Sequence, residues 1–322
     1  MKNSSFISDS VFEMNLYYTR KQNKTKELFF RCLDQDKDEE YFKTELEKIW
    51  GNDEEEYISE QITIFREQIH KQHTSTKLGT IIIAGLGITK QLIDKTNKQF
   101  INKKIREYSV RINSPLLQTD KQDYLKKLVP KYTNDTKGYY SQGKLVRNVS
   151  PRTYNSMVYN TTLTRNGWIQ TLNDGEELNQ RLYYIPFHIF SCPYCMSYQE
   201  RIFTREECIR MLGTDNEGAE EILHPNCKCV LAFYDNDNPL REIDFAKGEE
   251  EYHIRQKVNS LTLKKSEIAN DIKIQKSLGN QDSVDKLNAQ RNNINKQIRE
   301  QKEKLDTREK QVSVTAIKRI FR

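Results

Sequence analysis

The chain has 322 residues, of which 36% are hydrophobic and 30% are charged, and it contains 17 Tyr and 13 Phe. This aromatic content excludes a disordered chain, and the length predicts about two domains. The stretch most like a membrane span, the uncharged run from Leu78 to Thr89, is shorter than the ~20 residues of a membrane-spanning helix. The first residues resemble no secretory signal, so we expect a folded protein of the cytosol without a membrane partner.

The first part of the chain, residues 1–135, predicts an N-terminal helical region. Apolar residues recur at steps of three and four at Tyr41, Phe42, Leu46, Ile49 and Trp50, and again at Ile58, Ile62, Phe65 and Ile69. The apolar run from Ile81 to Ile88 contains two glycines and fits a buried helix. A phosphate-binding loop is a poorer interpretation of this run, because no Walker pattern and no preceding strand are evident.

Residues 136–245 predict a compact α+β module. The stretch from Tyr139 to Phe190 is rich in Tyr, Thr, Asn and Val, and Asn166-Gly167 and Asn173-Asp174-Gly175 are turn signals. The run from Leu182 to Phe190 has the composition of a strand, and Pro186 within it predicts an edge strand or a strand that is split.

Five of the six cysteines lie between Cys192 and Cys229, in the motifs Cys192-Pro-Tyr-Cys195 and His224-Pro-Asn-Cys227-Lys-Cys229. In a reducing cytosol, clustered cysteines indicate metal binding more than disulfides. A Cys-x-x-Cys turn places two thiolates on one side of a metal, and the second motif can supply a histidine and a further thiolate. The spacing therefore predicts a structural Zn²⁺ site bound by Cys192, Cys195, His224 and one of Cys227 and Cys229.

Other interpretations of the cysteines stay open. Buried cysteines without metal are one, and a thioredoxin-like redox motif is another, although the βαβ pattern that it needs is not evident. Cys208 lies in an expected helix and is the least expected ligand, and His188 fits a strand histidine better than a ligand. Four ligands at this spacing indicate a closed site, whereas a catalytic zinc keeps one position open for water.

No catalytic residues are predicted. The His-Pro-Asn run resembles zinc-supported HNH nucleases, but these need a second catalytic histidine at short range, and the next histidine is His253. No pair of acid and base or of nucleophile and base is evident, so we expect neither an enzyme nor a small-molecule substrate.

Residues 246–322 predict a basic helical hairpin. Apolar residues at heptad spacing occur at Ile254, Val258, Leu261, Ile268 and Ile272, and again at Val284, Leu287, Ile294, Ile298 and Leu305. A turn at Gly279 separates the two series and favours two antiparallel helices over about Glu249–Lys310. From Phe245 to Arg322 there are 18 Lys and Arg against 11 Asp and Glu, so the whole positive excess of the chain lies here. If the chain binds polyanions, we therefore expect this segment to bind them. The alternative is that its charges keep a long exposed helix soluble.

Together these patterns predict a mainly α protein with a small central α+β module stapled by zinc and a long C-terminal helical hairpin. Several motifs follow one another in a recognisable order: Tyr154-Asn155-Ser156-Met157-Val158, Thr161-Thr162, Phe187-His188-Ile189, the Cys192–Cys195 turn, Gln199-Glu200-Arg201-Ile202-Phe203-Thr204 and the His224–Cys229 motif. This order resembles the phage minor capsid protein 2 family, which is related to head-morphogenesis proteins of tailed bacteriophages. The resemblance covers about residues 150–235. Glu200 stands at the glycine of the family's Gln-Gly-Lys-type turn, and Lys228 stands where the family commonly has Arg.

The resemblance implies a structural protein present at low copy in the virion head, at or near the portal vertex, and made in the host cytoplasm. Its implied partners are the portal protein, the major capsid protein or both, and packaged DNA through the basic hairpin. Two alternatives stay open. One is a zinc-dependent nuclease packaged in the head, and the other is a nucleic-acid-binding adaptor without sequence preference.

Overall fold

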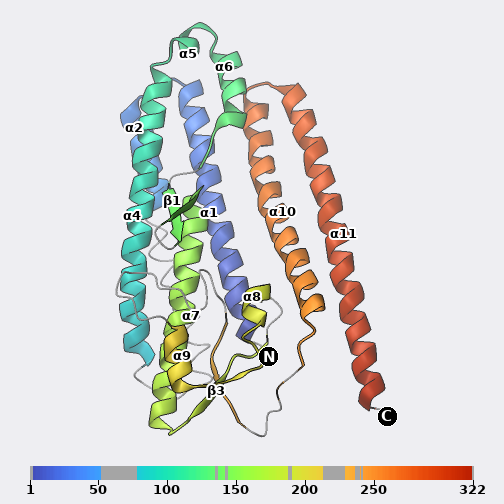
Figure 1. Cartoon of the computed structure of the whole chain (residues 1–322). Coiled ribbons are helices and arrows are strands. Elements are labelled where there is room, and N and C mark those ends of the chain that lie inside the picture. Colours follow the sequence, from blue (N-terminus) through green and yellow to red (C-terminus); the bar gives the residue numbers. More distant parts are fainter. Residues whose placement is uncertain are drawn as a thin grey trace. The chain divides into compact units, whose positions relative to one another are not determined.

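The structure is a computed structural model, and it is mainly helical, as the sequence predicts (Figure 1). It describes residues 3–51, 78–134, 137–141, 144–187, 191–212, 229–235, 240 and 242–320. The chain forms two compact units, Met1–Ile243 and Asp244–Arg322, and each is described by itself.

The first unit begins with helices and ends with a small sheet. Its first half contains α1 (Asn3–Asp34), α2 (Glu39–Gly51), α4 (Leu78–Ile112), α5 (Pro115–Thr119), α6 (Lys121–Leu128) and the 3-10 helix η1 (Val129–Lys131). Its second half contains the antiparallel pair β1 (Lys137–Ser141) and β2 (Lys144–Val149), helix α7 (Pro151–Glu177), β3 (Leu182–Tyr184), α8 (Pro193–Met196), β4 (Ile202–Thr204), α9 (Arg205–Met211) and β5 (Ala232–Phe233).

Two of the predictions for the N-terminal region can be compared with these elements. The periodicity around Phe42 forms α2, which buries Phe42, Leu46 and Trp50 and leaves Tyr41 exposed. The apolar run from Leu78 to Thr89 forms the start of α4. The series from Ile58 to Ile69 lies outside the described residues. In the part of the chain that the structure describes, no helix has the length and apolarity needed to cross a membrane.

Helix α7 packs against both α1 and α4, and the three helices lie side by side (Figure 1). The sequence placed a boundary between residues 135 and 136, but α7 belongs to the same compact unit as the N-terminal helices. Polar side chains link the three helices. Asn155 donates to Asn97 Oδ1 of α4 at 3.0 Å, and Ser156 donates to Asn15 Oδ1 of α1 at 3.1 Å. The helical region therefore continues past residue 135.

The two turn signals predicted within α7 are wrong, because one helix runs through both of them. Ser150 caps its start by accepting a hydrogen bond from the Thr153 N–H, and Pro151 occupies its first position, where proline suits a helix. Trp168 and Leu172 are buried between the two glycines. Because helix propensity is a weak preference, burial of these side chains overrides the tendency of Asn and Gly to form turns.

An aromatic cluster holds the turn between α1 and α2. The Phe42 ring stacks on Tyr108 of α4 with ring centroids 4.2 Å apart, and Phe29 of α1 meets both rings edge to face. Tyr108 also donates its hydroxyl hydrogen to the main-chain oxygen of Lys37 at 2.6 Å. Such ring pairs add about 0.5–1.5 kcal/mol each to the free energy gained by burial alone.

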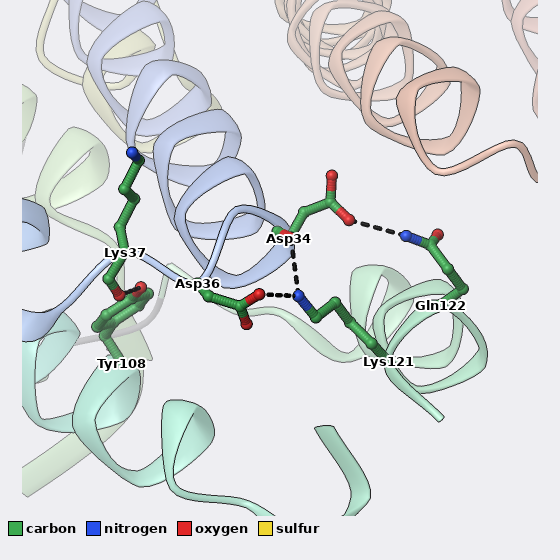
Figure 2. A network of polar contacts seen from close by, with 6 residues as sticks. All are labelled: Asp34, Asp36, Lys37, Tyr108, Lys121 and Gln122. Atoms are coloured by element: carbon green, nitrogen blue, oxygen red, sulfur yellow. Dashed lines mark hydrogen bonds and ion pairs between the residues drawn. The ribbon is translucent and has the colours of Figure 1, made fainter. Parts of the chain in front are cut away.

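Polar contacts from α6 secure the same turn (Figure 2). The Lys121 ammonium donates to the main-chain oxygen of Asp34 at 3.0 Å and forms an ion pair with the Asp36 carboxylate. The side-chain amide of Gln122 donates to Asp34 Oδ1 at 2.8 Å. Asp36 has a φ of 51°, a left-handed conformation that Asp tolerates better than most residues. Residues of α6, some 85 positions further along the chain, thus fix the C-terminal end of α1.

Lys104 of α4 is completely buried. Its ammonium donates to Glu107 Oε2 at 2.9 Å and to the main-chain oxygen of Thr133, and it lies 3.8 Å from the centroid of the Tyr132 ring. Burial lowers the pKa of Lys104 to about 8, although the Glu107 carboxylate acts in the opposite direction. Through these contacts the lysine holds the segment after η1 against α4. Burial removes the ammonium from water, and this destabilises its charged form.

The small sheet has the strand order β4-β3-β5, with both pairs antiparallel. In this register Phe203 and Phe233 lie opposite Tyr183, which is completely buried. β3 ends at Tyr184, two residues before Pro186, so the predicted strand is shorter than its composition indicates. β3 lies in the centre of the sheet and not at its edge. Residues 188–190 of the predicted run lie outside the described residues.

The second unit is the helical hairpin that the heptad pattern predicts. It contains α10 (Phe245–Ser277) and α11 (Gln281–Ile320), and Gly279 in the turn has a φ of 64°, which favours glycine. Asp244 caps the start of α10 by accepting a hydrogen bond from the Lys247 N–H at 3.0 Å. The core between the helices consists of heptad residues, namely Leu261, Ile268, Ile272, Val284 and Ile294, with Leu287 and Ile298 packed against them.

A comparison of the two α7 glycines tests the close approach of β3 to this helix. A Cβ atom on Gly175 would collide with the Tyr183 hydroxyl oxygen and lie 2.9 Å from Cζ of that ring, whereas a Cβ on Gly167 has open space. Gly175→Ala should therefore lower the free energy of unfolding by about 1–3 kcal/mol. Gly167→Ala should raise it by roughly 0.5–1 kcal/mol, because alanine favours a helix.

Urea denaturation measures both effects. Tyr183→Phe removes the colliding oxygen, so in the Gly175→Ala background it should recover part of the loss. Equal effects of alanine at both glycines would contradict the described packing.

The buried ammonium of Lys104 predicts a pH dependence of stability. In the unfolded chain this lysine titrates near its ordinary pKa of 10.5, so above pH 8 the unfolded state binds more protons than the folded state. The free energy of unfolding of the natural chain should therefore rise, relative to that of Lys104→Met, by about 1 kcal/mol between pH 7.5 and 9. Denaturation at several pH values measures this difference.

The measurements stay at or below pH 9 because burial raises the pKa of Cys32 and of Tyr108. Above their ordinary pKa values of 9.0 and 10.0, these two groups lower the free energy of unfolding as the pH rises. Parallel pH profiles of the two proteins between pH 7.5 and 9 would contradict a buried, charged Lys104.

Candidate metal centre

The Cys192–Cys195 motif forms a tight turn at the start of α8. Cys192 caps this short helix, and its Sγ accepts a hydrogen bond from the Cys195 N–H at 3.4 Å. Pro193 fits the first helical position, since it lacks the N–H that would have no partner there. Cys195 is buried and Cys192 is half-buried. A main-chain N–H that points at a sulfur stabilises the thiolate, which is the form that binds metals.

Cys229 reaches the same core from a distant part of the sequence. It is completely buried, and its main-chain oxygen accepts a hydrogen bond from the Trp168 indole N–H at 2.7 Å. The chain continues from Cys229 through buried Leu231 into β5. The core cluster consists of Trp168, Leu172, Tyr183, Ile185, Cys195, Cys208, Leu212, Cys229 and Leu231, with Cys192 packed against it.

Three of the five predicted ligands thus belong to one small core. His224 and Cys227 lie outside the described residues, as does His188. Among the residues that the structure describes, no three His, Cys, Asp or Glu side chains form a group that could hold a metal ion. The Cys192–Cys195 turn fits half of a tetrahedral zinc site, and zinc itself stays a prediction.

Cys208 lies in α9, which is helical as the sequence predicts. The helix begins with a capping box: Thr204 accepts from the Glu207 N–H, and the Glu207 carboxylate accepts from the Thr204 N–H. Burial, together with the nearby Glu207 and Glu206 carboxylates, raises the pKa of Cys208 to about 12. A thiol that stays protonated is a poor metal ligand, which supports the interpretation of Cys208 as a core residue.

Gln199 links the two cysteine-bearing segments. Its amide Nε2 donates to Ser191 Oγ, directly before Cys192, and to Cys229 Sγ at 3.5 Å. The side chain is 2% exposed, and its Oε1 is a buried acceptor that has no hydrogen-bond partner among the described residues. One signal in the sequence pointed to this residue, because Gln199 belongs to the turn on which the family resemblance rests. Its contact with Cys229 could not be predicted.

Glu200 has a φ of 54°, in the left-handed region that glycine adopts most easily. Two hydrogen bonds hold the glutamate there: its N–H donates to Ile185 O at 2.8 Å, and its Oε1 accepts from the Phe187 N–H at 2.7 Å. The turn after the cysteine motif is therefore fastened to the chain that leaves β3.

In comparisons with known proteins, no family model matches the chain, and no curated protein or solved structure matches it. The functional argument therefore depends on the residues and their contacts.

Three substitutions of Glu200 separate its two roles. Glu200→Gln keeps a side-chain oxygen for the Phe187 N–H and should change the free energy of unfolding by less than about 0.5 kcal/mol. Glu200→Ala loses that acceptor and keeps the strained backbone, so it should destabilise by about 1–2 kcal/mol. Glu200→Gly loses the acceptor but relieves the strain, so its effect should lie between the other two. Urea denaturation gives the order, and an alanine variant as stable as the glycine variant would contradict it.

Proposed function

We propose that the chain is a structural minor capsid protein of a tailed bacteriophage. It acts in head assembly at or near the portal and contributes to DNA packaging or delivery. The observation that carries this proposal is that residues on which the resemblance rests lie close together in the structure. Cys192, Cys195 and Gln199 are neighbours in one small core, and Cys229 of the second cysteine motif reaches the same core.

Zinc would have a structural role in this protein. Cys192, Cys195, His224 and one of Cys227 and Cys229 would hold it, and the bound ion would cross-link the two cysteine-bearing segments. The support for this is the thiol pair at the α8 turn and the arrival of the second segment at the same core. A closed site of this kind stabilises a fold and requires no catalytic group.

The second unit is proposed as the element that attaches the protein to its partners. Among the residues whose side chains the structure describes, the cluster between its two helices has five buried apolar members, with Leu287 and Ile298 packed against it. Most helical stability in proteins comes from packing of an apolar face, so a hairpin with this narrow core gains from a partner surface. The proposed partners are the portal protein, the major capsid protein or both, in the virion.

The charge of the hairpin supports a second contact, with packaged DNA. Its excess of seven positive charges includes Lys264, Lys265, Lys276 and Lys286, which are all exposed. Ammonium groups that meet phosphates release counterions, and this release drives binding without sequence preference.

Truncation after Ile243 tests the attachment role, because the remaining chain is the complete first unit. If the hairpin attaches the protein, the truncated form should be missing from purified heads, while the full-length protein is present. Quantitative immunoblotting of heads from cells that produce the other head proteins measures this. Incorporation of the truncated form at the full-length level would contradict the proposal.

Charge variants serve as the control and test the DNA contact. Replacing Lys264, Lys265, Lys276 and Lys286 by Gln should leave incorporation unchanged, but it should weaken DNA binding and flatten its dependence on salt by a slope of up to about 3–4. The same four positions changed to Arg should bind DNA like the natural chain. Equal salt dependence of the Gln and Arg variants would show that the charges only keep the hairpin soluble. Metal-dependent DNA cleavage by the purified protein would favour a packaged nuclease instead.

A further inference from the structure

We infer that the exposed face of α4 binds the phosphate backbone of duplex DNA through Lys95, Lys98 and Arg106. The proposed function places its DNA contact on the second unit alone. This inference goes beyond it, because it gives the first unit a DNA contact of its own, without preference for base sequence.

The side chains of residues 93–112 in α4 divide into two opposite faces. The buried face consists of Ile93, Asn97, Phe100, Lys104 and Tyr108. The opposite face consists of exposed residues, namely Lys95, Lys98, Gln99, Asn102 and Arg106. Steps of three and four residues connect the members of this second set, and residues at such steps are neighbours on an α-helix. The five exposed side chains therefore form one row along the helix.

The exposed row is positively charged, and no acidic residue belongs to it. Residues 93–112 contain two acidic residues. The Glu107 carboxylate accepts a hydrogen bond from the buried Lys104, and Asp94, one turn before Lys98, is half-buried. Lys95, Lys98 and Arg106 form no hydrogen bond or ion pair with any residue that the structure describes. Their charges are therefore available to a partner.

The net charge of the chain conceals this row. The positive excess lies in the second unit, because acidic residues on other elements of the first unit balance its basic ones. Glu39 and Glu47 of α2, which packs against α4, are exposed examples. Salt at physiological concentration screens exposed charges beyond about 8 Å. A partner that touches the row thus meets the local positive charge and not the net charge of the unit.

Duplex DNA fits this row better than an acidic protein or a membrane does. From Lys95 to Arg106 the helix rises about 16 Å, and a duplex presents about ten phosphate charges over that length. Each cation can therefore meet a phosphate in any register. The side-chain amides of Gln99 and Asn102 can donate to phosphate oxygens, as such amides do at DNA backbones. None of the five side chains is apolar, whereas a helix that lies in a membrane surface needs an apolar face.

A triple variant of the full-length chain, with Lys95→Gln, Lys98→Gln and Arg106→Gln, tests the contact. Fluorescence anisotropy measures its affinity for a duplex of about 30 base pairs at several salt concentrations. The affinity should fall at least about 10-fold at 100 mM salt. The slope of log affinity against log salt should flatten by about 2–3, because up to three phosphates lose their cation. Glutamine favours a helix about as well as lysine and arginine, and urea denaturation checks that the fold is kept.

Three basic residues of α1 supply a matched control. Arg20, Lys24 and Arg31 are exposed and share one helix face, but Glu27 lies among them on that face. Changing these three to Gln removes the same number of charges and should lower the affinity less than about 2-fold. Equal losses in the α1 and α4 variants would show that only net charge matters and would overturn the inference. Natural affinity and salt slope in the α4 variant would overturn it as well.

A charge-retaining variant gives a second control. Lys95→Arg, Lys98→Arg and Arg106→Lys together keep all three cations and should bind DNA like the natural chain. Loss of affinity in this variant, with the fold intact, would contradict binding by phosphate contacts. If the triple Gln variant does not fold, Lys98→Gln with Arg106→Gln must flatten the salt slope by about 1–2 for the inference to stand.

Combined variants separate this contact from the one proposed for the hairpin. In the chain whose four hairpin lysines are changed to Gln, the α4 changes should cause the same further loss, because each set of cations releases its own counterions. No further loss there would assign all DNA binding to the second unit and overturn the α4 contact alone. A natural chain without salt-dependent DNA binding would overturn both contacts, while incorporation into heads tests the virion role separately. Binding to phosphatidylserine vesicles that the α4 changes abolish, with natural DNA binding, would replace DNA by an anionic membrane.

Discussion

Burial of helix α7 is the constraint on which the first unit depends. Near its start the helix packs between α1 and α4, and near its end Trp168 and Leu172 belong to the core that contains the cysteines. A helix buried in this way must satisfy its polar side chains internally, because each buried group without a partner costs about 1–3 kcal/mol. The hydrogen bonds from Asn155 Nδ2 to Asn97 and from Ser156 Oγ to Asn15 each pair one such donor. These bonds also fix the rotation of α7 against its neighbours.

The candidate site depends on α7, because the sheet beside it is very small. Its strands have only two or three residues each, fewer than the five or six that are usual, and such a sheet is not stable without a covering layer. Trp168 supplies that layer and also bonds to the main chain at Cys229. The cysteine turn is held against the sheet by Glu200 and Gln199. A metal would thus add to a core that already brings the two segments together.

The second unit is stabilised differently. Two long helices share a narrow row of apolar side chains, and the turn at Gly279 closes them into a hairpin. Several charged residues on its described part are exposed, among them Lys264, Lys265, Lys276 and Lys286. A structure of this kind suits binding along an extended surface, which agrees with the attachment role proposed for it.

The sequence by itself determined the features that arise from local patterns. The heptad spacing and Gly279 predict the C-terminal hairpin, and the periodicity around Phe42 predicts α2. Of the residues singled out by the cysteine spacing, Cys192, Cys195 and Cys229 are described and lie in one core. Periodicity and short motifs are sufficient here because neighbouring residues in the chain supply the interactions.

Only the tertiary structure decided the rest. Asn166-Gly167 and Asn173-Asp174-Gly175 continue a helix because residues far away in the sequence bury α7, and Gly175 is required by the approach of Tyr183. Lys104 is buried although lysine is usually exposed, since Thr133 and Glu107 accept its hydrogen bonds. Contacts between residues that are distant along the chain leave no periodic trace in the sequence. Their outcome therefore becomes visible only when the chain is folded.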